Sequence, residues 1–226
     1  MNDSGDILTA TELRKSFGRG KGRVHVLRGL DIAVRRGEFL AVMGPSGCGK
    51  TTLLHVLGLI SAPDAGQVAI DGRPAPRDES GRSALRRTTL GFVFQRFNLL
   101  ETLSGADNVA VSLRVRGLRV DGWVNELLAR VAVADAARRK PAEMSVGEQQ
   151  RIAVVRALAH RPAIVLADEP TGSLDSANAA ALLDLLRELN RREGQTLVMI
   201  THSAEAAAHA DRVLEMRDGR ILSQTG

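Results

Sequence analysis

The sequence predicts an α/β fold with a mainly parallel sheet, an antiparallel β edge and an inserted helical region. Three observations lead to this prediction. Short apolar runs of strand length alternate with segments whose apolar residues recur at helical spacing. Glycine-containing turns divide the first forty residues into extended segments. A glycine-rich stretch also joins one apolar run to a helical segment, which is the pattern of a strand, a loop and a helix.

The first part of the chain favours β structure. Residues 7–43 contain extended segments separated by turns at residues 18–22 and at Arg36-Gly37, which indicates antiparallel strands. Phe39 to Met43 is apolar throughout, as expected of a buried strand. We expect a helix after the glycine-rich stretch, with this apolar face: Leu53, Leu54, Leu57 and Ile60.

The middle of the chain changes from short strands to helices. Residues 67–70 and 90–94 favour strands, and the polar residues 74–83 between them favour a loop. Residues 98–160 then favour a helical region, because apolar residues recur there at helical spacing. The residues of these two apolar stripes are Trp123, Val124, Leu127, Leu128 and Val131, and then Ile152, Val155 and Ala159.

The last part returns to alternating strands and helices. Ala163 to Ala167 and Thr196 to Ile200 are apolar runs of strand length. Between them, one face of a predicted helix carries Leu182, Leu185, Leu186 and Leu189. We therefore expect one domain over residues 1–226, with a core of 1–95 and 163–226 and a helical subdomain of 96–162.

Composition limits the partners of the chain. A net charge of +5 over 226 residues favours anionic partners such as nucleotides, nucleic acids or membrane surfaces. The chain has no Tyr, one Trp and five Phe, so it lacks the aromatic platforms that stack single-stranded bases, and no nucleic-acid partner is expected. No apolar run approaches the 18 or so residues of a membrane span, and the N-terminus lacks the pattern of a secretory signal. We expect a cytoplasmic protein.

The glycine-rich stretch from Gly44 to Thr51 matches the phosphate-binding pattern G-x-x-x-x-G-K-[ST]. In such a loop, backbone N–H groups and the N-terminus of a helix face the phosphates of a nucleotide. Lys50 would bridge the β- and γ-phosphates, and Thr51 would place its hydroxyl on a magnesium ion. The alternative is a glycine-rich turn that matches by chance. Cys48, the only cysteine, is expected to act as a small side chain, with a reactive thiol as the alternative.

Asp168 and Glu169 follow the apolar run 163–167, and Thr201-His202 follows the run 196–200. Ligands of parallel sheets bind at the carboxyl ends of the strands, where these residues and Lys50 are all expected to lie. Asp168 is positioned to hold magnesium, and Glu169 to orient or deprotonate an attacking water. The alternative is that the two acids only provide solvated charge at the end of a strand.

Five further segments give a specific resemblance. Met144 to Arg151 (MSVGEQQR) resembles the signature segment of ATP-binding cassette (ABC) ATPases, and it precedes the strand ending in Asp168-Glu169 as it does in that family. Gln95 resembles the glutamine-loop residue and His202 the switch histidine. Ser173-Leu174-Asp175 resembles the aspartate loop, and Phe17 stands where the family has an aromatic residue against adenine. These motifs occur in family order over nearly the whole chain.

The resemblance implies an ABC ATPase with a P-loop NTPase fold that uses ATP and Mg²⁺. It implies Glu169, His202 and Gln95 as catalytic residues, and Thr51, Gln95 and Asp168 as residues around the metal. The nucleotide-binding residues that it implies are Phe17, Gly44, Pro45, Ser46, Gly47, Cys48, Gly49, Lys50, Thr51, Thr52, Ser145, Gly147, Glu148 and Asp175. The chain departs from the family at Val146, where a glycine is usual. If that position needs a positive φ, a β-branched residue weakens the signature contacts.

The resemblance also implies partners. In this family the signature of one subunit closes over the nucleotide of a second, so a homodimer with ATP at its interface is expected. A separate membrane permease is expected to dock beside Gln95, on the segment 96–100, whose apolar residues are alternatively ordinary packing residues. The segments 90–95 and 168–175 look most like the lipoprotein-release, macrolide-export and cell-division branch, which places the chain on the inner face of the cell membrane.

Two other functions remain open at this stage. The first is a soluble ABC ATPase that acts on nucleic acid or ribosomes, which stimulation of hydrolysis by DNA or RNA would indicate. The second is a nucleotide-gated scaffold with weak hydrolysis, which the departure at Val146 favours.

Overall fold

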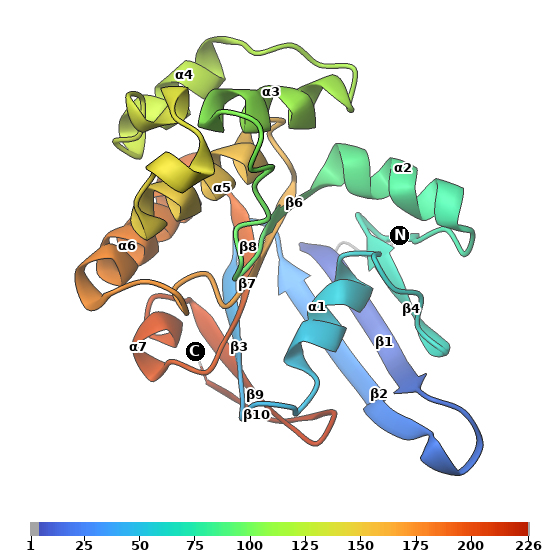
Figure 1. Ribbon diagram of the computed structural model, residues 1–226. Coiled ribbons are helices and arrows are strands. Elements are labelled where there is room, and N and C mark those ends of the chain that lie inside the picture. Colours follow the sequence, from blue (N-terminus) through green and yellow to red (C-terminus); the bar gives the residue numbers. More distant parts are fainter. Residues whose placement is uncertain (1–4, 226) are drawn as a thin grey trace.

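Two β-sheets enclose the first α-helix, and further helices cover the outer face of the second sheet (Figure 1). The computed structural model describes residues 5–225. The strands are β1 (Asp6–Phe17), β2 (Val24–Arg35), β3 (Phe39–Met43), β4 (Ala65–Ile70), β5 (Arg73–Pro74), β6 (Leu90–Val93), β7 (Ile164–Asp168), β8 (Thr196–Thr201), β9 (Arg212–Arg217) and β10 (Arg220–Thr225). The α-helices are α1 (Lys50–Leu57), α2 (Glu79–Thr89), α3 (Gly105–Arg114), α4 (Gly122–Arg130), α5 (Val146–Leu158), α6 (Ser176–Glu193) and α7 (Ala204–Ala207). Short 3-10 turns occur at Gly20–Gly22, Ala136–Arg138 and Pro141–Glu143.

The first sheet is antiparallel, with the strand order β2-β1-β4-β5. The second sheet has the order β10-β9-β3-β8-β7-β6, and its pairings are parallel except at the β9–β10 hairpin. The predicted parallel sheet and antiparallel β edge are therefore confirmed. The interior positions of β3, β7 and β8 are apolar because both faces of these strands are covered.

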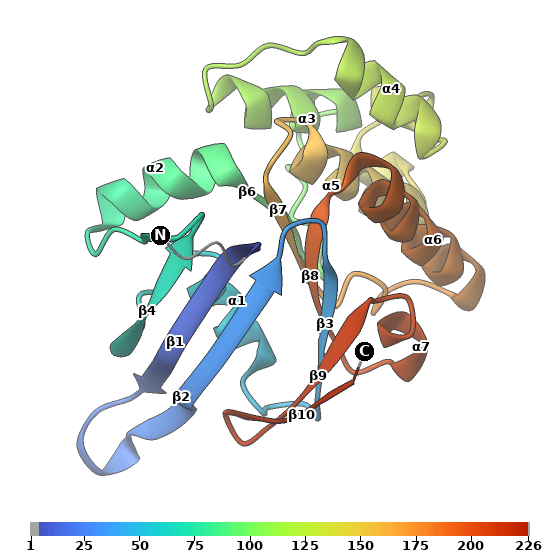
Figure 2. The ribbon, with the colours of Figure 1, turned by 180° about the vertical axis from the view of Figure 1, so that it is seen from behind.

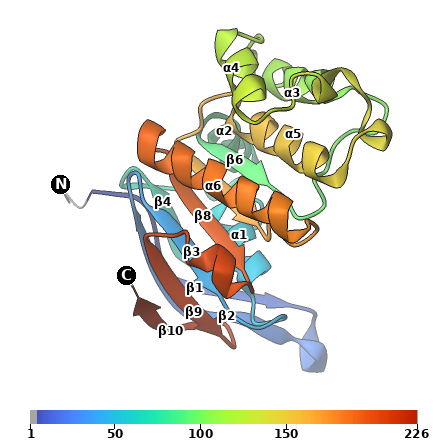
Figure 3. The same cartoon turned by 90° about the vertical axis from the view of Figure 1, so that its left-hand side faces the viewer.

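The core has one layer on each face of the second sheet. On one face, Leu53, Leu54 and Leu57 of α1 pack between the two sheets. On the other face, α3, α4, α5 and α6 supply the apolar side chains (Figure 2). Figure 3 shows α6 lying across this face, with α3, α4 and α5 gathered at one end of it. Among residues 5–225, no helix combines the length and the apolar character needed to cross a bilayer.

Two sequence predictions about the first ninety residues were wrong. The turn at Arg36-Gly37 does not join antiparallel strands, because it carries the chain from β2 in the first sheet to β3 in the second. Residues 79–83, expected in a loop, begin helix α2. None of its residues is buried, so it has no apolar stripe to reveal it. It is held instead by the Asp78 cap and by the ion pairs of Glu79 with Arg82 and Arg86.

Two predicted helix faces need small corrections. Helix α1 ends at Leu57 and Gly58, so Ile60 lies outside it and is 40% exposed. In α6, Leu183 is buried beside Leu182, Leu186 and Leu189, whereas Leu185 is only partly buried. The buried stripe of α6 is therefore rotated slightly from the predicted one. The helices predicted within residues 98–160 are present as α3, α4 and α5.

Candidate functional site

The glycine-rich stretch forms a tight loop between β3 and α1. Gly49 caps α1 with φ +108°, a conformation that favours glycine. Lys50 is 6% exposed, and its Nζ donates hydrogen bonds to the carbonyl oxygens of Gly44 (2.7 Å) and Pro45 (3.0 Å). The lysine is thus held beneath the curve of its own loop. Pro45, Ser46 and Gly47 form the exposed tip of that loop, and Thr52 is partly buried.

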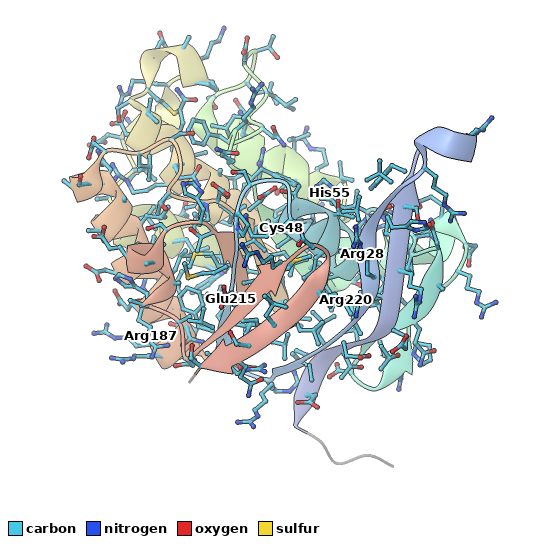
Figure 4. The ribbon with its side chains drawn as sticks, turned by 90° about the horizontal axis from the view of Figure 1, so that it is seen from below. Arg28, Cys48, His55, Arg187, Glu215 and Arg220 are labelled. Atoms are coloured by element: carbon cyan, nitrogen blue, oxygen red, sulfur yellow. The ribbon has the colours of Figure 1, made fainter. Side chains whose placement is uncertain are left out.

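The turn between β9 and β10 supports this loop from outside. The N–H of Gly219 donates to the carbonyl oxygen of Cys48 at 3.0 Å, and the carbonyl oxygen of Gly219 accepts from the N–H of Arg28 at 3.0 Å. A Cβ added to Gly44 would lie 2.1 Å from the carbonyl oxygen of Met216, so this close approach also requires glycine. Figure 4 shows Cys48 and Arg28 on either side of the hairpin end. Cys48 is 6% exposed, which fits the expected role of a small packing side chain.

Two oxygen atoms meet beside the lysine. The Oγ1 of Thr51, in the first turn of α1, lies 3.5 Å from the Oδ1 of Asp168 at the end of β7. Burial raises the pKa of Asp168, while a positive charge on His55 would oppose that shift. A partly buried carboxylate beside a hydroxyl is a donor set that suits a hard divalent cation, which prefers oxygen ligands.

Glu169 and His202 form a contact at the ends of neighbouring strands. The Nδ1 of His202 lies 2.6 Å from the Oε2 of Glu169. The glutamate side chain is 17% exposed and the histidine side chain 60% exposed, so the carboxylate lies deeper. Glu169 has φ +44°, a strained value for a residue other than glycine. The hydrogen bond from its N–H to the carbonyl oxygen of Ile200 holds this conformation at 3.0 Å.

Gln95 lies on the same side of the site. The backbone oxygen of Gln95 accepts a hydrogen bond from the Oγ of Ser173 at 3.4 Å. A Cβ added to Gly172 would lie 3.1 Å from the Nε2 of Gln95 and 3.6 Å from the Oε2 of Glu169. The absence of a side chain at Gly172 therefore leaves the glutamine and the glutamate facing the same space.

The signature segment begins helix α5. Ser145 is the N-cap, and its Oγ accepts from the N–H of Glu148 at 3.2 Å, while Glu148 Oε2 accepts from the N–H of Ser145 at 2.8 Å. Glu148 also pairs with Arg139 at 2.7 Å. The hydrogen bond from the Ser145 backbone, followed by that ion pair, lowers the pKa of Glu148. The glutamate, predicted as a nucleotide contact, is therefore occupied in a capping box.

Val146 is the first residue of α5 and has helical backbone geometry. It is absent from the residues with positive φ in the described chain, so the condition under which valine would weaken the signature is not met. Its side chain is 46% exposed. Replacement of the usual glycine therefore leaves the backbone of this helix start intact.

The signature helix and the predicted aspartate loop are tied together. Asp175 caps α6 by accepting from the N–H of Asn178 at 2.9 Å, a bond that also lowers the pKa of Asp175. The Asn178 side chain donates to Asp175 at 2.7 Å and accepts from Arg151 at 3.3 Å. A Cβ on Gly147 would lie 2.6 Å from the Oδ1 of Asn178. Close packing therefore explains the glycine at position 147.

Sequence reasoning missed Gln150 and Asn178. Gln150 is fully buried, and its Nε2 donates to the carbonyl oxygen of Pro170 at 2.7 Å, one residue beyond Glu169. Both residues are polar positions on helices, and only tertiary packing shows what they contact. The sequence alone does not show that Gln150 is buried, because its partner Pro170 lies in a different segment of the chain.

The predicted site residues fall into three groups. Lys50, Thr51, Asp168, Glu169 and His202 meet at the carboxyl ends of β3, β7 and β8, which are adjacent in the sheet, and Gln95 borders them. Ser145, Gly147, Glu148 and Asp175 gather where α5 meets α6. Phe17 lies at the end of β1, is 50% exposed and has the Nζ of Lys15 5.6 Å from its ring centre. Within residues 5–225, no hydrogen bond joins Ser145 or Phe17 to the first group.

A phosphate-binding loop, an adjacent oxygen pair and a glutamate at the ends of parallel strands define a P-loop nucleotide-hydrolysing protein. Comparison with known proteins identifies the family. The family model described as ABC transporter matches residues 27–172. The lipoprotein-releasing system ATP-binding protein LolD of Bordetella pertussis is 46% identical over 224 residues, which cover 97% of each chain. The macrolide export ATP-binding/permease protein MacB of Chlorobium luteolum is 44% identical over 220 residues, covering 96% of this chain but 33% of MacB.

Solved structures agree with this assignment. The dimeric structure of MJ0796, a bacterial ABC transporter cassette, has a TM-score of 0.89 and 34% identity and covers 96% of this chain and 97% of that chain. The dimeric post-hydrolysis state of MJ0796 bound to ADP and Pi has a TM-score of 0.88 and 33% identity, with the same coverage. The chain therefore belongs to the ABC transporter family, as an ATP-binding and ATP-hydrolysing cassette.

Proposed function

We propose that this cassette works as a homodimer that drives a separate membrane permease of the lipoprotein-release or macrolide-export type. The near-complete match to LolD and the match to one third of MacB support this type of permease. The dimeric MJ0796 structures support the homodimer. Docking on a permease would hold the chain at the inner face of the cell membrane, in the cytoplasm.

The observation that carries the proposal is the arrangement at three adjacent strand ends. Lys50 follows β3, the Glu169 carboxylate follows β7, and the His202 ring follows β8 and lies 2.6 Å from that carboxylate. In this proposal the loop N–H groups and Lys50 bind the phosphates of ATP. Phe17 covers the adenine, and the remaining residues of the loop, from Gly44 to Thr52, shape the pocket around the phosphates.

Mg²⁺ fits the oxygen pair of Thr51 and Asp168, with Gln95 beside them. The ion would neutralise phosphate charge when bound. Because burial raises the pKa of Asp168, a nearby cation would also favour the ionised carboxylate. These side chains hold and orient the ligands, and the chemistry then depends on where Glu169 lies.

Glu169 is the proposed general base. Its carboxylate faces the space beside Gly172, where a water in line with the γ-phosphate could be deprotonated. Its backbone is held by Ile200 and Gly172, so the carboxylate needs little rearrangement to act. His202 lies against the carboxylate and is proposed to orient it and to contact the γ-phosphate.

The second group of residues completes the site of the other subunit. Ser145 and Gly147 at the start of α5 present a helix N-terminus, which suits the γ-phosphate of ATP held by the partner. Glu148 and Asp175 then act by shaping this start and the adjoining loop. We also propose the division of the chain into a core of 1–95 and 163–226 and a helical subdomain of 96–162, with the permease docking along residues 96–100. The mutual packing of α3, α4 and α5 supports this division.

Replacing the base tests the proposal. Glu169→Gln keeps the size of the side chain and one acceptor oxygen but cannot accept the proton, so ATP hydrolysis should fall about 100-fold or more while ATP binding persists. The variant should accumulate as an ATP-dependent dimer in sedimentation velocity. Glu126→Gln, at a 59% exposed position on α4, is the matched control and should behave like the parent chain. Full hydrolysis by the Glu169 variant would remove this residue as the base.

A further inference from the structure

The loop between α3 and α4 exposes apolar and basic side chains in alternation. Val115, Leu118 and Val120 are 65%, 47% and 49% exposed. Three large exposed hydrophobic residues thus lie within six positions of the chain. Arg114, directly before Val115, and Arg119, between Leu118 and Val120, are also exposed. We call Arg114–Val120 the α3–α4 surface. Apolar side chains concentrated in this way usually mark an interaction site.

The surface has a fixed shape. The N–H of Leu118 donates to the carbonyl oxygen of Leu113 at 3.0 Å, and the N–H of Gly117, which has φ +72°, donates to that of Arg114 at 3.0 Å. Arg116 folds back and donates to the carbonyl oxygens of Ser112 (2.6 Å) and Arg87 (2.9 Å). The apolar side chains are therefore exposed on a turn that its own hydrogen bonds hold in place.

The positive charge of this surface is not neutralised by the chain. Arg87, Arg114, Arg116 and Arg119 have no carboxylate within ion-pair distance in the part of the chain that the structure describes. Burial and the charge of Arg87 both lower the pKa of Arg116, as expected of a cation without an acidic partner. The adjoining Asp121 pairs instead with Arg161 at 3.3 Å, on the far side of the loop. An anionic partner would complete the charge balance.

The surface lies beside the segment proposed to meet the permease. Arg156 donates to the carbonyl oxygens of Phe97 (2.6 Å) and Asn98, and burial, followed by the nearby charge of Arg116, lowers the pKa of Arg156. Arg116 of the loop therefore lies near the arginine that holds residues 97–98. In Figure 1 the loop runs over the top of the helical region, away from both sheets. A permease seated on 96–100 would bring the bilayer near this loop, and this step rests on the proposed function.

We propose that the α3–α4 surface binds the anionic headgroups of phospholipids. The arginines contact lipid phosphates, and Val115, Leu118 and Val120 enter the interface between headgroups and acyl chains. Charge complementarity selects this partner, because a row of arginines interleaved with aliphatic residues matches an anionic surface with an apolar interior. Nucleic acid matches the charge but offers no environment for three aliphatic side chains.

Flotation of the purified chain with vesicles tests this proposal without the permease. The chain should float with phosphatidylcholine vesicles that contain about half phosphatidylglycerol, but not with pure phosphatidylcholine, and salt should weaken the binding. Arg114→Gln with Arg119→Gln should reduce partitioning about 25-fold, since each arginine near such a surface contributes roughly fivefold. The matched control is Arg217→Gln with Arg220→Gln, which removes two exposed arginines from the β9–β10 hairpin.

A fluorescent label tests the insertion of the apolar side chains. Leu118→Cys can be labelled selectively, because Cys48, the only native cysteine, is 6% exposed. An environment-sensitive dye at position 118 should shift to the blue on anionic vesicles, whereas the same dye in Leu222→Cys should not. If all variants hydrolyse ATP at the rate of the parent chain, they are folded. If the parent chain itself hydrolyses no ATP, that result counts against the proposed function and not against this proposal.

Three results would overturn the proposal. The first is equal flotation of the parent chain with neutral and anionic vesicles, or with neither. The second is equal binding by the arginine double variant and the parent chain. The third is a loss of permease co-purification in the arginine double variant with unchanged vesicle affinity, which would make this surface a protein interface.

Discussion

The core half of the proposed site and its signature half differ in how far one chain can complete them. In the core half, β3, β7 and β8 bring Lys50, Asp168 and Glu169 together, and each is in contact with a neighbour. In the signature half, the hydrogen bond of the Ser145 hydroxyl within residues 5–225 lies inside its own helix. A single chain therefore holds a candidate phosphate pocket and, separately, a helix N-terminus suited to another phosphate. Under the proposed function, two copies together make one complete site.

The two halves also differ in what holds them. Apolar strands fix the core half, since β3, β7 and β8 are almost entirely buried. Two polar side chains, one buried and one partly buried, also connect the helical region to the core: Gln150 reaches Pro170, and the Nε2 of His160 lies 3.1 Å from the carbonyl oxygen of Leu90. Substitutions of these two side chains should act through lost hydrogen bonds and, for His160, through pH, rather than through lost apolar area.

The largest expected effect comes from inactivating one half of the site in each of two variants. A mixed dimer of the two variants then restores one complete site. Lys50→Ala and Ser145→Ala should each abolish most hydrolysis, the second with about 1 kcal/mol lost from the α5 cap. Mixing equal amounts of the two variants should recover about a quarter of the parent rate, because random pairing makes about half of the dimers mixed and each mixed dimer contains one intact site of two. Steady-state phosphate release measures this recovery.

The control for that mixture is Lys50→Ala with the Lys50→Ala/Ser145→Ala double variant, in which every dimer lacks an intact site. This mixture should stay inactive. No recovery in the first mixture, with both variants folded and dimeric, would show that the site is not shared between subunits.

The next effect concerns the connection between the halves. Gln150→Ala removes the hydrogen bond to Pro170 and leaves a buried carbonyl unsatisfied, so the free energy of unfolding should fall by about 2 kcal/mol. Gln149→Ala, which loses hydrogen bonds at a partly buried position, should cost less than about 1 kcal/mol. Urea unfolding compares the two variants, and equal losses would argue against a special role for Gln150.

A pH effect distinguishes the helical region from the core. Burial, followed by the charge of Arg116, lowers the pKa of His160 to about 4. The unfolded chain takes up this proton near pH 6.5 and the folded chain only near pH 4, so the stabilising contribution is lost as pH falls between those values. After discounting for solvent screening, we expect roughly 1 to 2 kcal/mol.

Urea unfolding at pH 7.5 and pH 4.5 measures this contribution. His160→Gln has no proton to bind in this range, so its stability should fall less than that of the parent chain over the same interval. Equal losses in the two proteins would show that other groups cause the acid sensitivity.

The smallest effect concerns the start of the signature helix. Val146 already has helical geometry, so Val146→Gly relieves no strain and should cost about 0.5 to 1 kcal/mol in stability. Hydrolysis per folded dimer should change less than twofold. A marked rise in the rate would instead support a signature that valine weakens through its side chain.

Most of the fold could be predicted because its core elements carry apolar patterns of their own. The buried strands, α1 and α6 and the helical region were all expected from apolar runs or stripes. Helix α2 was not, because its stability comes from a cap and from the pairs of Glu79 with Arg82 and Arg86, which leave no apolar period. The change of sheet at Arg36-Gly37 was missed since a turn between two strands does not reveal which neighbours they pair with.

The site shows the same division. Lys50, Asp168 and Glu169 stand at the ends of recognisable strands, so their meeting follows from parallel topology. Gln150 and Asn178 form hydrogen bonds between α5 and segments distant in the sequence. Such contacts could not be predicted from the residues on either side of them in the chain. The capping role of Glu148 was present in the spacing of Ser145 and Glu148, a serine followed three residues later by an acid.

The hydrogen bonds of Lys50 to its own loop have a consequence for the speed of ATP capture. A loop already curved around its lysine does not need to be ordered when ATP arrives. The conformational entropy of ordering the loop is therefore not subtracted from the affinity for ATP. At the proposed site, the incoming phosphates replace two carbonyl oxygens as partners of the ammonium group. We therefore expect the association of ATP to be limited by encounter rather than by ordering of the loop.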